Sequence, residues 1–147
     1  MVRVEARSII SAPASALWQI MMEVDQYPQW YSAMVEASGT PRLGAKLKFR
    51  VQAMDGSPRQ FPFTGTVVEF VPERKLVWTG GMFPILMGRH YFEFVPMGDA
   101  QTKVIQGEEF RGLFPLFAGR KKMLALSPAY ERFHAELAAR AAARIAS

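Results

Sequence analysis

The fold of this chain is decided by the stretch SAPASALWQIMMEVDQYPQW, which occupies positions 11–30. Just before it, Val2–Ile10 largely alternates apolar and charged side chains, the period of a half-buried β-strand. Ser11 is a good helix cap, and Pro13 suits a first helical turn because its missing N–H has no partner to lose there. We therefore expect a strand followed at once by a short helix. The apolar side chains at helical spacing are Leu17, Met21 and Val24.

A second, single-turn helix is expected from Asp25 onward, because Pro28 limits how far it can continue. Tyr27 and Trp30 are large and only partly polar, so we interpret them as wedges that pack against a sheet. Such wedges would brace and close one end of that sheet. The side chains expected to do so are Leu17, Trp18, Tyr27 and Trp30.

The 147 residues contain no linker and no internal repeat, so we expect a single domain over residues 1–147. A chain of this length buries roughly 70% of its unfolded surface and needs no disulfide or metal to fold. The absence of Cys excludes a disulfide-stapled scaffold and a thiolate nucleophile. The N-terminus lacks the layout of a signal peptide, and charges interrupt every long apolar run. A soluble cytoplasmic protein is therefore expected.

The formal net charge is +5, but the 18 basic residues are spread along the chain among 13 acidic ones. Nucleic-acid binding usually needs a clustered basic face with aromatic residues between the bases. A nucleic-acid partner is therefore not expected.

Six further segments show strand-like patterns and are separated by turn-forming residues. They are Ala33–Ser38, Lys46–Gln52, Phe63–Val71, Leu76–Thr79, Gly88–Val95 and Gln101–Arg111. In the third of them, alternation predicts that Thr64, Thr66, Val68 and Phe70 share one face. From Gly119 the period becomes helical. The helical stripe comprises Met123, Leu126, Tyr130, Phe133, Leu137 and Ala141.

Pro128 interrupts this last helix. Either Ser127 caps a fresh helix with Pro128 in its first turn, or one long helix kinks there, and we favour the kink. The order of elements predicts an α+β fold, with two short helices between the first and second strands. A seven-stranded antiparallel sheet would curl around the long C-terminal helix and leave a gap beside it.

Several motifs, in this order, resemble the START-like (SRPBCC) superfamily, and most of all its polyketide cyclase/dehydrase and lipid-transport branch. They are the Ser11-Ala-Pro-Ala opening with Leu17-Trp18, Asp25-x-Tyr-Pro-x-Trp30, Pro72-x-x-x-Leu-Val-Trp78, His90-x-Phe92 and Glu109-Phe110-x-Gly112. The resemblance implies a helix-grip fold with a deep cavity between the sheet and the C-terminal helix, usually holding an apolar or amphipathic ligand. It implies no particular reaction, because members include carriers, sensors and enzymes.

The last two strands bring a polar group into the expected cavity wall. An antiparallel register places Phe94 opposite Val104, Phe92 opposite Gln106, and His90 opposite Glu108. A carboxylate beside an imidazole in an apolar pocket is typical of a tuned acid/base pair. The alternative is that these groups satisfy one another and only orient a ligand. A slip of one residue would turn Glu108 outward and Glu109 inward.

Neither metal nor cofactor is expected. His134, the only other histidine, is expected at the surface or the flank of the last helix, and two His without Cys give no zinc pattern. The sequence also contains no Gly-x-Ser-x-Gly elbow, Walker loop or Gly-x-Gly-x-x-Gly motif.

Two loops, at positions 82–87 and 113–117, contain no polar side chain. One interpretation is that these loops form a lid, a ligand contact or a membrane-docking tip. The alternative is that they pack on each other. Arg120-Lys121-Lys122 follows and either captures an anionic group or is a solvated charge run. The residues predicted to contact a ligand are Phe49, Val68, Phe70, Trp78, Met82, Phe83, Met87, Phe92, Phe94, Phe110, Phe114, Phe117, Lys121, Tyr130 and Phe133.

These features favour binding or transport of a hydrophobic or amphipathic small molecule, such as a lipid, a polyketide-like aromatic or an isoprenoid. The alternative is a metal-free cyclase or dehydratase acting on a polyketide-like carbonyl compound. In that case His90 and Glu108 would exchange protons, and Gln106 would hold the developing enolate oxygen. A third hypothesis is a module whose apolar loops make a transient contact with a membrane or a protein.

Overall fold

The computed structural model describes residues 1–53 and 56–147. The first strand leads directly into two short helices, as predicted, but Pro13 and not Ser11 is the N-cap residue of the first helix, and no side chain caps it. The elements are β1 (Val2–Ile10), α1 (Ala14–Met22), the 3₁₀ helix η1 (Val24–Gln29), β2 (Met34–Ser38), β3 (Lys46–Gln52), β4 (Gln60–Val71), β5 (Lys75–Met82), β6 (Leu86–Pro96), β7 (Thr102–Arg111), the π-helix η2 (Pro115–Gly119), α2 (Arg120–Leu124) and α3 (Ser127–Ala146).

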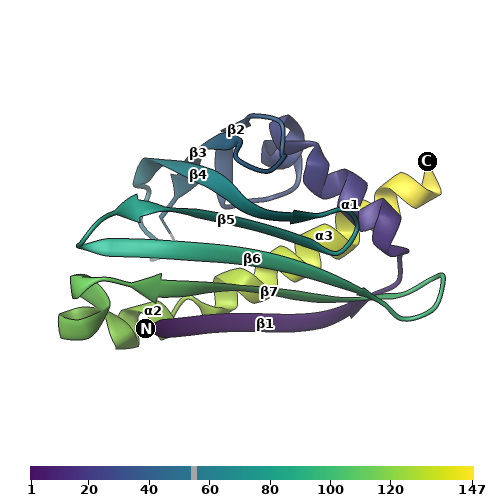
Figure 1. The fold of residues 1–147 in the computed structure, drawn as a ribbon. Coiled ribbons are helices and arrows are strands. Elements are labelled where there is room, and N and C mark those ends of the chain that lie inside the picture. The colour runs from purple at the N-terminus through teal and green to yellow at the C-terminus, as the bar shows by residue number, and fades with distance from the viewer. Residues whose placement is uncertain (54–55) are drawn as a thin grey trace.

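All seven strands form one antiparallel sheet in the order β1-β7-β6-β5-β4-β3-β2. Strands β2 to β7 follow one another in space as in sequence, and β1 pairs with β7. The sheet curves, and α3 runs across one of its faces (Figure 1). The α+β helix-grip fold predicted from the sequence is therefore confirmed.

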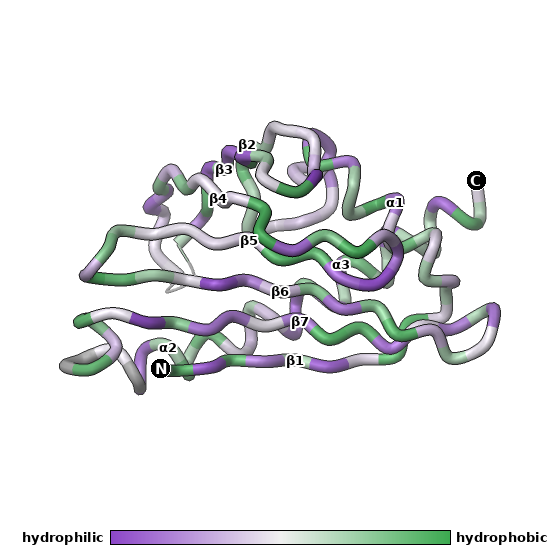
Figure 2. Tube along the Cα trace, in the orientation of Figure 1, coloured by the Kyte–Doolittle hydropathy of each residue, from purple (hydrophilic) through white to green (hydrophobic). Residues whose placement is uncertain are grey.

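The face that meets α3 is apolar because each strand alternates its side chains across the sheet. Leu47, Phe49 and Val51 on β3 are all buried, as the alternation predicts. Figure 2 shows hydrophobic and hydrophilic residues alternating along the strands. The helical stripe of α3 packs on this face through Tyr130 and Phe133 and two smaller apolar residues, Leu137 and Ala141.

The helices after β1 fill one end of the fold. Leu17, Trp18 and Tyr27 are buried in the main hydrophobic core, and Trp30 packs against that core while partly exposed. The Tyr27 hydroxyl donates a 2.7 Å hydrogen bond to the carbonyl of Met21, which ties η1 to α1. The prediction that this stretch braces one end of the sheet agrees with these contacts.

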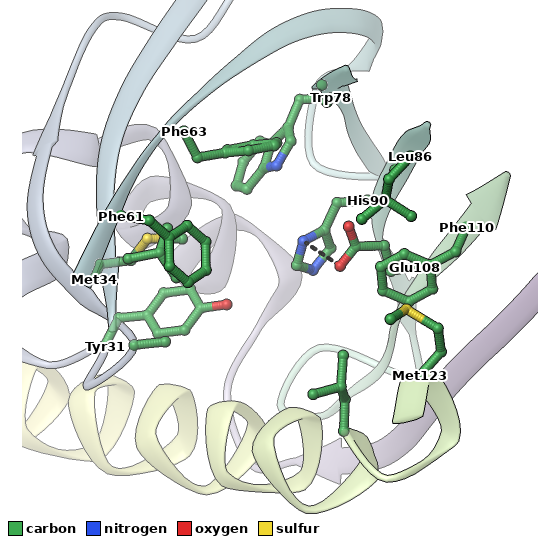
Figure 3. A pocket seen from close by; sticks show the side chains of 16 residues that line it. Tyr31, Met34, Phe61, Phe63, Trp78, Leu86, His90, Glu108, Phe110 and Met123 are labelled. Carbon is green, nitrogen blue, oxygen red and sulfur yellow. Dashed lines mark ion pairs between the residues drawn. The ribbon is translucent and has the colours of Figure 1, made fainter. Parts of the chain in front are cut away.

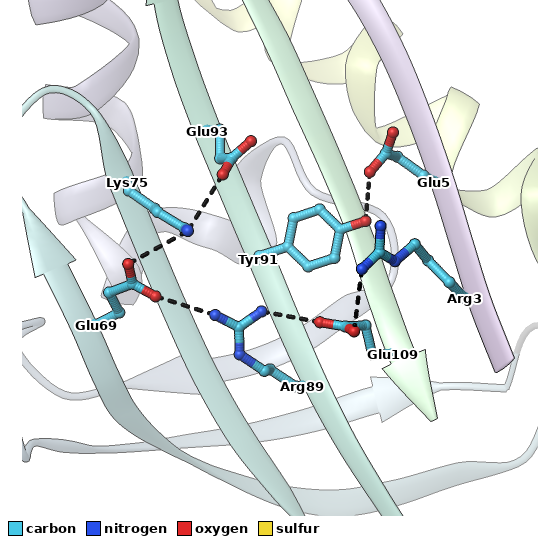
Figure 4. Close-up of polar contacts among 8 residues, drawn as sticks. All are labelled: Arg3, Glu5, Glu69, Lys75, Arg89, Tyr91, Glu93 and Glu109. Carbon is cyan, nitrogen blue, oxygen red and sulfur yellow. Dashed lines mark hydrogen bonds and ion pairs between the residues drawn. The ribbon is translucent and has the colours of Figure 1, made fainter. Parts of the chain in front are cut away.

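The opposite face of the sheet carries a charged network (Figure 4). Arg89 donates to Glu109 at 2.9 Å and to Glu69 at 3.0 Å, and Lys75 pairs with Glu69 and Glu93. Most of these side chains are partly exposed, so each pair contributes only about 0–1 kcal/mol to stability. The network identifies the solvent-facing side and leaves the cavity to the other side.

A β-bulge in β4 overturns the prediction that Val68 faces the cavity. The pairing of β4 with β5 shifts register between Val67 and Glu69. Val67 is buried, whereas Val68 is 46% exposed. A bulge inserts one extra residue into the strand. The side chains before it therefore point to the opposite face from the one that uninterrupted alternation predicts. Phe63, Gly65 and Val67 therefore share the inner face that Phe70 continues after the bulge.

The kink favoured at Pro128 is also wrong. Helix α2 ends at Leu124, and α3 begins at Ser127 with Pro128 in its first turn. A new helix accepts proline there because its first N–H groups have no intrahelical partners. In addition, residues 115–119 form the π-helix η2 where an apolar loop was expected.

His134 is buried, not at the surface as the sequence suggested. Its Nδ1 lies 2.5 Å from the hydroxyl of Ser8 on β1, and its side chain lies between α3 and the sheet. Burial lowers the pKa of His134 to about 4, so the imidazole is neutral at physiological pH.

Candidate ligand-binding site

A cavity of about 310 Å³ lies on the inner side of the sheet, next to the junction between α2 and α3. Its walls are mainly aromatic and aliphatic (Figure 3). The aromatic residues are Tyr31, Phe61, Phe63, Trp78 and Phe110. The aliphatic ones are Ala33, Met34, Val51, Leu86, Met123 and Leu126, and three glycines complete the wall, Gly80, Gly81 and Gly88.

Glycines in the strands make room for the large side chains beside the cavity. A Cβ atom on Gly80 would lie 2.6 Å from the ring of Phe63, and one on Gly65 would lie 2.8 Å from the ring of Trp78. A Cβ on Gly88 would lie 2.4 Å from Oε2 of Glu108. These positions accept no larger residue unless the neighbour moves, so the glycines fix where these side chains lie.

One polar group interrupts the apolar wall. The register pairs His90 with Glu108, Phe92 with Gln106 and Phe94 with Val104, as predicted. His90 Nδ1 lies 3.8 Å from Oε1 of Glu108, which also accepts a 2.8 Å hydrogen bond from the Tyr130 hydroxyl. Strands β6 and β7 together with α3 thus fix the position of this carboxyl group.

Burial sets the protonation of this group. It raises the pKa of Glu108 to about 7, although the hydrogen bond from Tyr130 acts in the opposite direction. Burial also lowers the pKa of His90 to about 3, since the ring is packed against Trp78 and stacked on Phe92. His90 is therefore neutral near pH 7, and Glu108 is the member of the pair that changes charge in that range.

Gln106 orients His90. Its amide Nε2 lies 2.9 Å from Nε2 of His90, and Nδ1 of the same ring faces Glu108. Gln106 is fully buried and does not border the cavity. Gln106 was predicted to hold a ligand oxygen, but its side chain does not border the cavity. Its contact with His90 suits a residue that positions the imidazole.

Tyr31 is a cavity residue that the sequence reasoning missed. It lies between η1 and β2, and its hydroxyl points across the cavity toward His90 and Glu108 (Figure 3). Phe61 and Phe63 were missed as well, because β4 begins at Gln60, earlier than expected, and contains the bulge. The adjacent aromatic pair Trp30-Tyr31 was the available signal for Tyr31.

The predicted contact residues fall into several groups. Trp78 and Phe110 line the cavity together with His90 and Glu108. Four others do not, because α1, η1 and α3 cover their end of the sheet and make them part of the hydrophobic core: Phe49, Phe92, Phe94 and Phe133. Phe70 packs edge-on against Trp18 of the same core. Tyr130 is buried behind the wall, where it binds Glu108.

The remaining predicted contacts lie at the rim or outside it. Met82, Phe83 and Lys121 are exposed, and none of them borders the cavity. Met87 is partly exposed and also lies outside the wall. Phe114 packs against the small apolar cluster that contains Val2 and Phe110. The side chain of Phe117 lies outside the described part of the structure.

Within residues 1–53 and 56–147, no three His, Asp or Glu side chains gather in the way metal ligands do. None of the helices in these ranges has the length and apolar character needed to cross a membrane. Among the described residues that line the cavity, Glu108 is the one that carries a carboxyl group.

The curved sheet, the α3 helix and the apolar cavity beside it define a START-like protein of the helix-grip class. Residues 1–142 match the family described as polyketide cyclase / dehydrase and lipid transport, and the chain belongs to this family. The resemblance seen in the sequence motifs is thereby confirmed. No curated protein matches the chain in sequence.

Solved structures share the fold at low sequence identity. The aromatase/cyclase ZhuI from Streptomyces sp. R1128 superposes with a TM-score of 0.79 at 16% identity, covering 97% of this chain and 94% of that one. A START superfamily protein from Mycobacterium smegmatis gives a TM-score of 0.77 at 17% identity, covering 95% of this chain and 96% of that one. These likenesses concern the fold.

Proposed function

We propose that the protein binds or carries a hydrophobic or amphipathic small molecule in the cavity described above. The observation that carries the proposal is the contrast within the wall, in which aromatic and aliphatic side chains surround the pair His90 and Glu108 and the hydroxyl of Tyr31. Binding sites for small molecules are commonly apolar with few polar groups that fix orientation. A volume of about 310 Å³ suits a compact ligand such as a small ring system or a short chain.

The polar group would orient the ligand. Near pH 7 the carboxyl group of Glu108 exchanges between a donor and an acceptor form, because its pKa is about 7. The Tyr31 hydroxyl faces it across the cavity. A ligand hydroxyl or carbonyl would hydrogen-bond to one or both of them, and the flat faces of Phe63 and Trp78 favour an aromatic or unsaturated body.

The test is ligand uptake measured by native mass spectrometry, using a panel of fatty acids, isoprenoids and polycyclic phenols. Leu126→Trp should block uptake because Leu126 borders the cavity. Leu124→Trp is the matched control, since Leu124 lies on α2, is 43% exposed and does not border the cavity. Equal uptake by both variants, or none by the parent, would refute the proposal.

A second candidate function is favoured by the geometry of the polar group, in which the Glu108 carboxyl borders the cavity 3.8 Å from His90 and faces the Tyr31 hydroxyl. A carboxyl group with a pKa of about 7 suits general acid/base catalysis at neutral pH. In a cyclase or dehydratase acting on a polyketide-like carbonyl compound, Glu108 would remove a proton from the carbon next to a carbonyl. The Tyr31 hydroxyl would then stabilise the enolate oxygen, and His90 would position the carboxylate.

Proton abstraction is measurable without knowledge of the natural substrate. In D₂O, the protein should accelerate deuterium incorporation at the activated carbon of an aromatic 1,3-diketone that it binds. Glu108→Gln should abolish this acceleration while the diketone still binds. Acceleration that survives in Glu108→Gln would exclude Glu108 as the base, and its absence in the parent would leave binding as the function.

A further inference from the structure

The end of the molecule next to the cavity exposes an unusual amount of apolar side chain. Phe83 is 83% exposed, Leu116 is 70% exposed and Met82 is 67% exposed. Three neighbours are about half exposed. We call this set the apolar tip, and its members are Met82, Phe83, Ile85, Leu113, Leu116 and Leu124.

Backbone hydrogen bonds join the segments that form the apolar tip. The N–H of Leu113 donates to the carbonyl of Pro84 at 3.0 Å, and the N–H of Phe114 donates to the carbonyl of Ile85 at 2.9 Å. The two segments are thus held together through their main chains, while most of their apolar side chains remain in solvent. The sequence left open that the two apolar loops pack on each other. They do contact each other through their main chains, but this contact leaves the apolar side chains uncovered.

Cations flank the apolar tip, and acidic residues are missing from its sequence. Arg111, Lys121 and Lys122 are exposed. The two stretches that carry the tip, positions 79–92 and 110–130, contain no Asp or Glu. An apolar surface bordered by Lys and Arg is complementary to the interface of a bilayer that contains anionic lipids.

The cavity lies directly behind this surface. Gly81 and Leu86 border the cavity and flank the β5–β6 turn, while Met123 and Leu126 border it from the side of α2. The β5–β6 turn and α2 lie at the same end of the sheet, opposite α1 (Figure 1). Any surface that docked onto the apolar tip would therefore lie close to the cavity.

We propose that the apolar tip docks onto the surface of an anionic phospholipid bilayer, with Phe83 and Leu116 entering the interface and Lys121 and Lys122 contacting the lipid phosphates. Docking would present the cavity to the membrane and allow an amphipathic ligand to move between them. Movement of a ligand between the cavity and the membrane rests on the proposed binding function, whereas docking itself does not.

Vesicle flotation tests the proposal with the full chain. The parent should float with vesicles of phosphatidylglycerol and phosphatidylcholine, and at least tenfold less with phosphatidylcholine alone or in high salt. Phe83→Asp and Leu116→Asp should each reduce binding at least tenfold. Met97→Asp is the control, because Met97 is 46% exposed in the β6–β7 turn at the opposite end of β6.

Charge reversal by Lys121→Glu with Lys122→Glu should remove the preference for anionic vesicles. Docking through the apolar tip is refuted if the parent does not float with anionic vesicles, or if Met97→Asp loses as much binding as Phe83→Asp. The proposal is also overturned if the parent does not bind vesicles and is a dimer by light scattering, whereas Phe83→Asp is a monomer. That result would show that the apolar tip binds a second copy of the chain.

Ligand uptake from solution separates this proposal from the binding function. Phe83→Asp should take up the same ligands as the parent when no vesicles are present, since Phe83 does not border the cavity. If the parent floats but takes up no ligand, the binding function fails and docking stands.

Discussion

The hydroxyl of Tyr130 on α3 donates a 2.8 Å hydrogen bond to Oε1 of Glu108 on β7. This contact joins the C-terminal helix to the polar part of the cavity wall. It also opposes the effect of burial on the carboxyl group, because a donated hydrogen bond stabilises the ionised form. The protonation of Glu108 and the seating of α3 are therefore linked.

Removal of that hydroxyl should raise the pKa of Glu108 further. In Tyr130→Phe the ionised carboxylate loses its donor, so the carboxyl group should titrate at higher pH than in the parent, as measured by ¹³C NMR of the Glu side chains. Above pH 7 the variant should also lose about 1–3 kcal/mol of stability. Tyr91→Phe is the control, because the Tyr91 hydroxyl binds Glu5 on the other face and its loss should leave Glu108 unchanged.

The stability of the protein should carry a signature of Glu108 between pH 4.5 and pH 7. In this window the folded state keeps a proton that the unfolded chain releases, because the pKa is about 7 in the fold and 4.5 in the unfolded chain. The contribution of Glu108 to the free energy of unfolding should therefore fall as pH rises, by about 3 kcal/mol across the window.

The two histidines change the stability with pH in the opposite direction to Glu108. The pKa values of His90 and His134 are lowered to about 3 and about 4, so stability from these groups is lost as pH falls below 6.5. The measurement is thus the difference between the parent and Glu108→Gln in urea unfolding at several pH values. A difference that stays constant from pH 4.5 to pH 7 would contradict the raised pKa.

Gly88→Ala should disturb Glu108 through a direct steric contact. The added methyl group would lie 2.4 Å from Oε2, so the carboxyl group must swing away and weaken its hydrogen bond with Tyr130. We expect a loss of about 1–2 kcal/mol in the free energy of unfolding. In a Glu108→Ala background most of this loss should disappear, because the nearest atoms to the new methyl group belong to Glu108. Equal losses in both backgrounds would contradict the contact.

Leu17→Ala should test the closed end of the fold. Leu17 is fully buried in the main core, so its truncation should lower stability by about 2–5 kcal/mol. Ligand affinity, measured under conditions where the variant remains folded, should change little because Leu17 does not border the cavity. A large loss of affinity in the folded variant would show that the two ends are coupled.

The sequence predicted the fold and the key register but only part of the cavity. Alternation along β6 and β7 was sufficient to pair His90 with Glu108, because a hairpin with a short turn leaves few other registers. The bulge at Val67–Glu69 gave no comparable signal, and it altered which residues of β4 face inward. Strand parity therefore misplaced Val68 and missed Phe63.

The predicted contacts erred for a second reason. Parity identifies which side chains point inward, but it does not distinguish a core position from a cavity position. Phe92 and Phe133 are buried against each other, and Phe133 also packs on Trp30 and Tyr31. The distinction depends on how far the helices reach along the sheet, which is a tertiary property.

The glycines in β5 and β6 give the protein a means of changing its ligand. The wall combines the main chain at Gly80 and Gly88 with residues of the main core such as Trp78. A methyl group added at Gly80 or Gly88 would alter the shape of the ligand space, but it would also displace Phe63 or Glu108 and so change stability. In evolutionary terms, selectivity and stability are coupled at these positions, so a related chain that changes its ligand here must also change the side chain that the glycine accommodates.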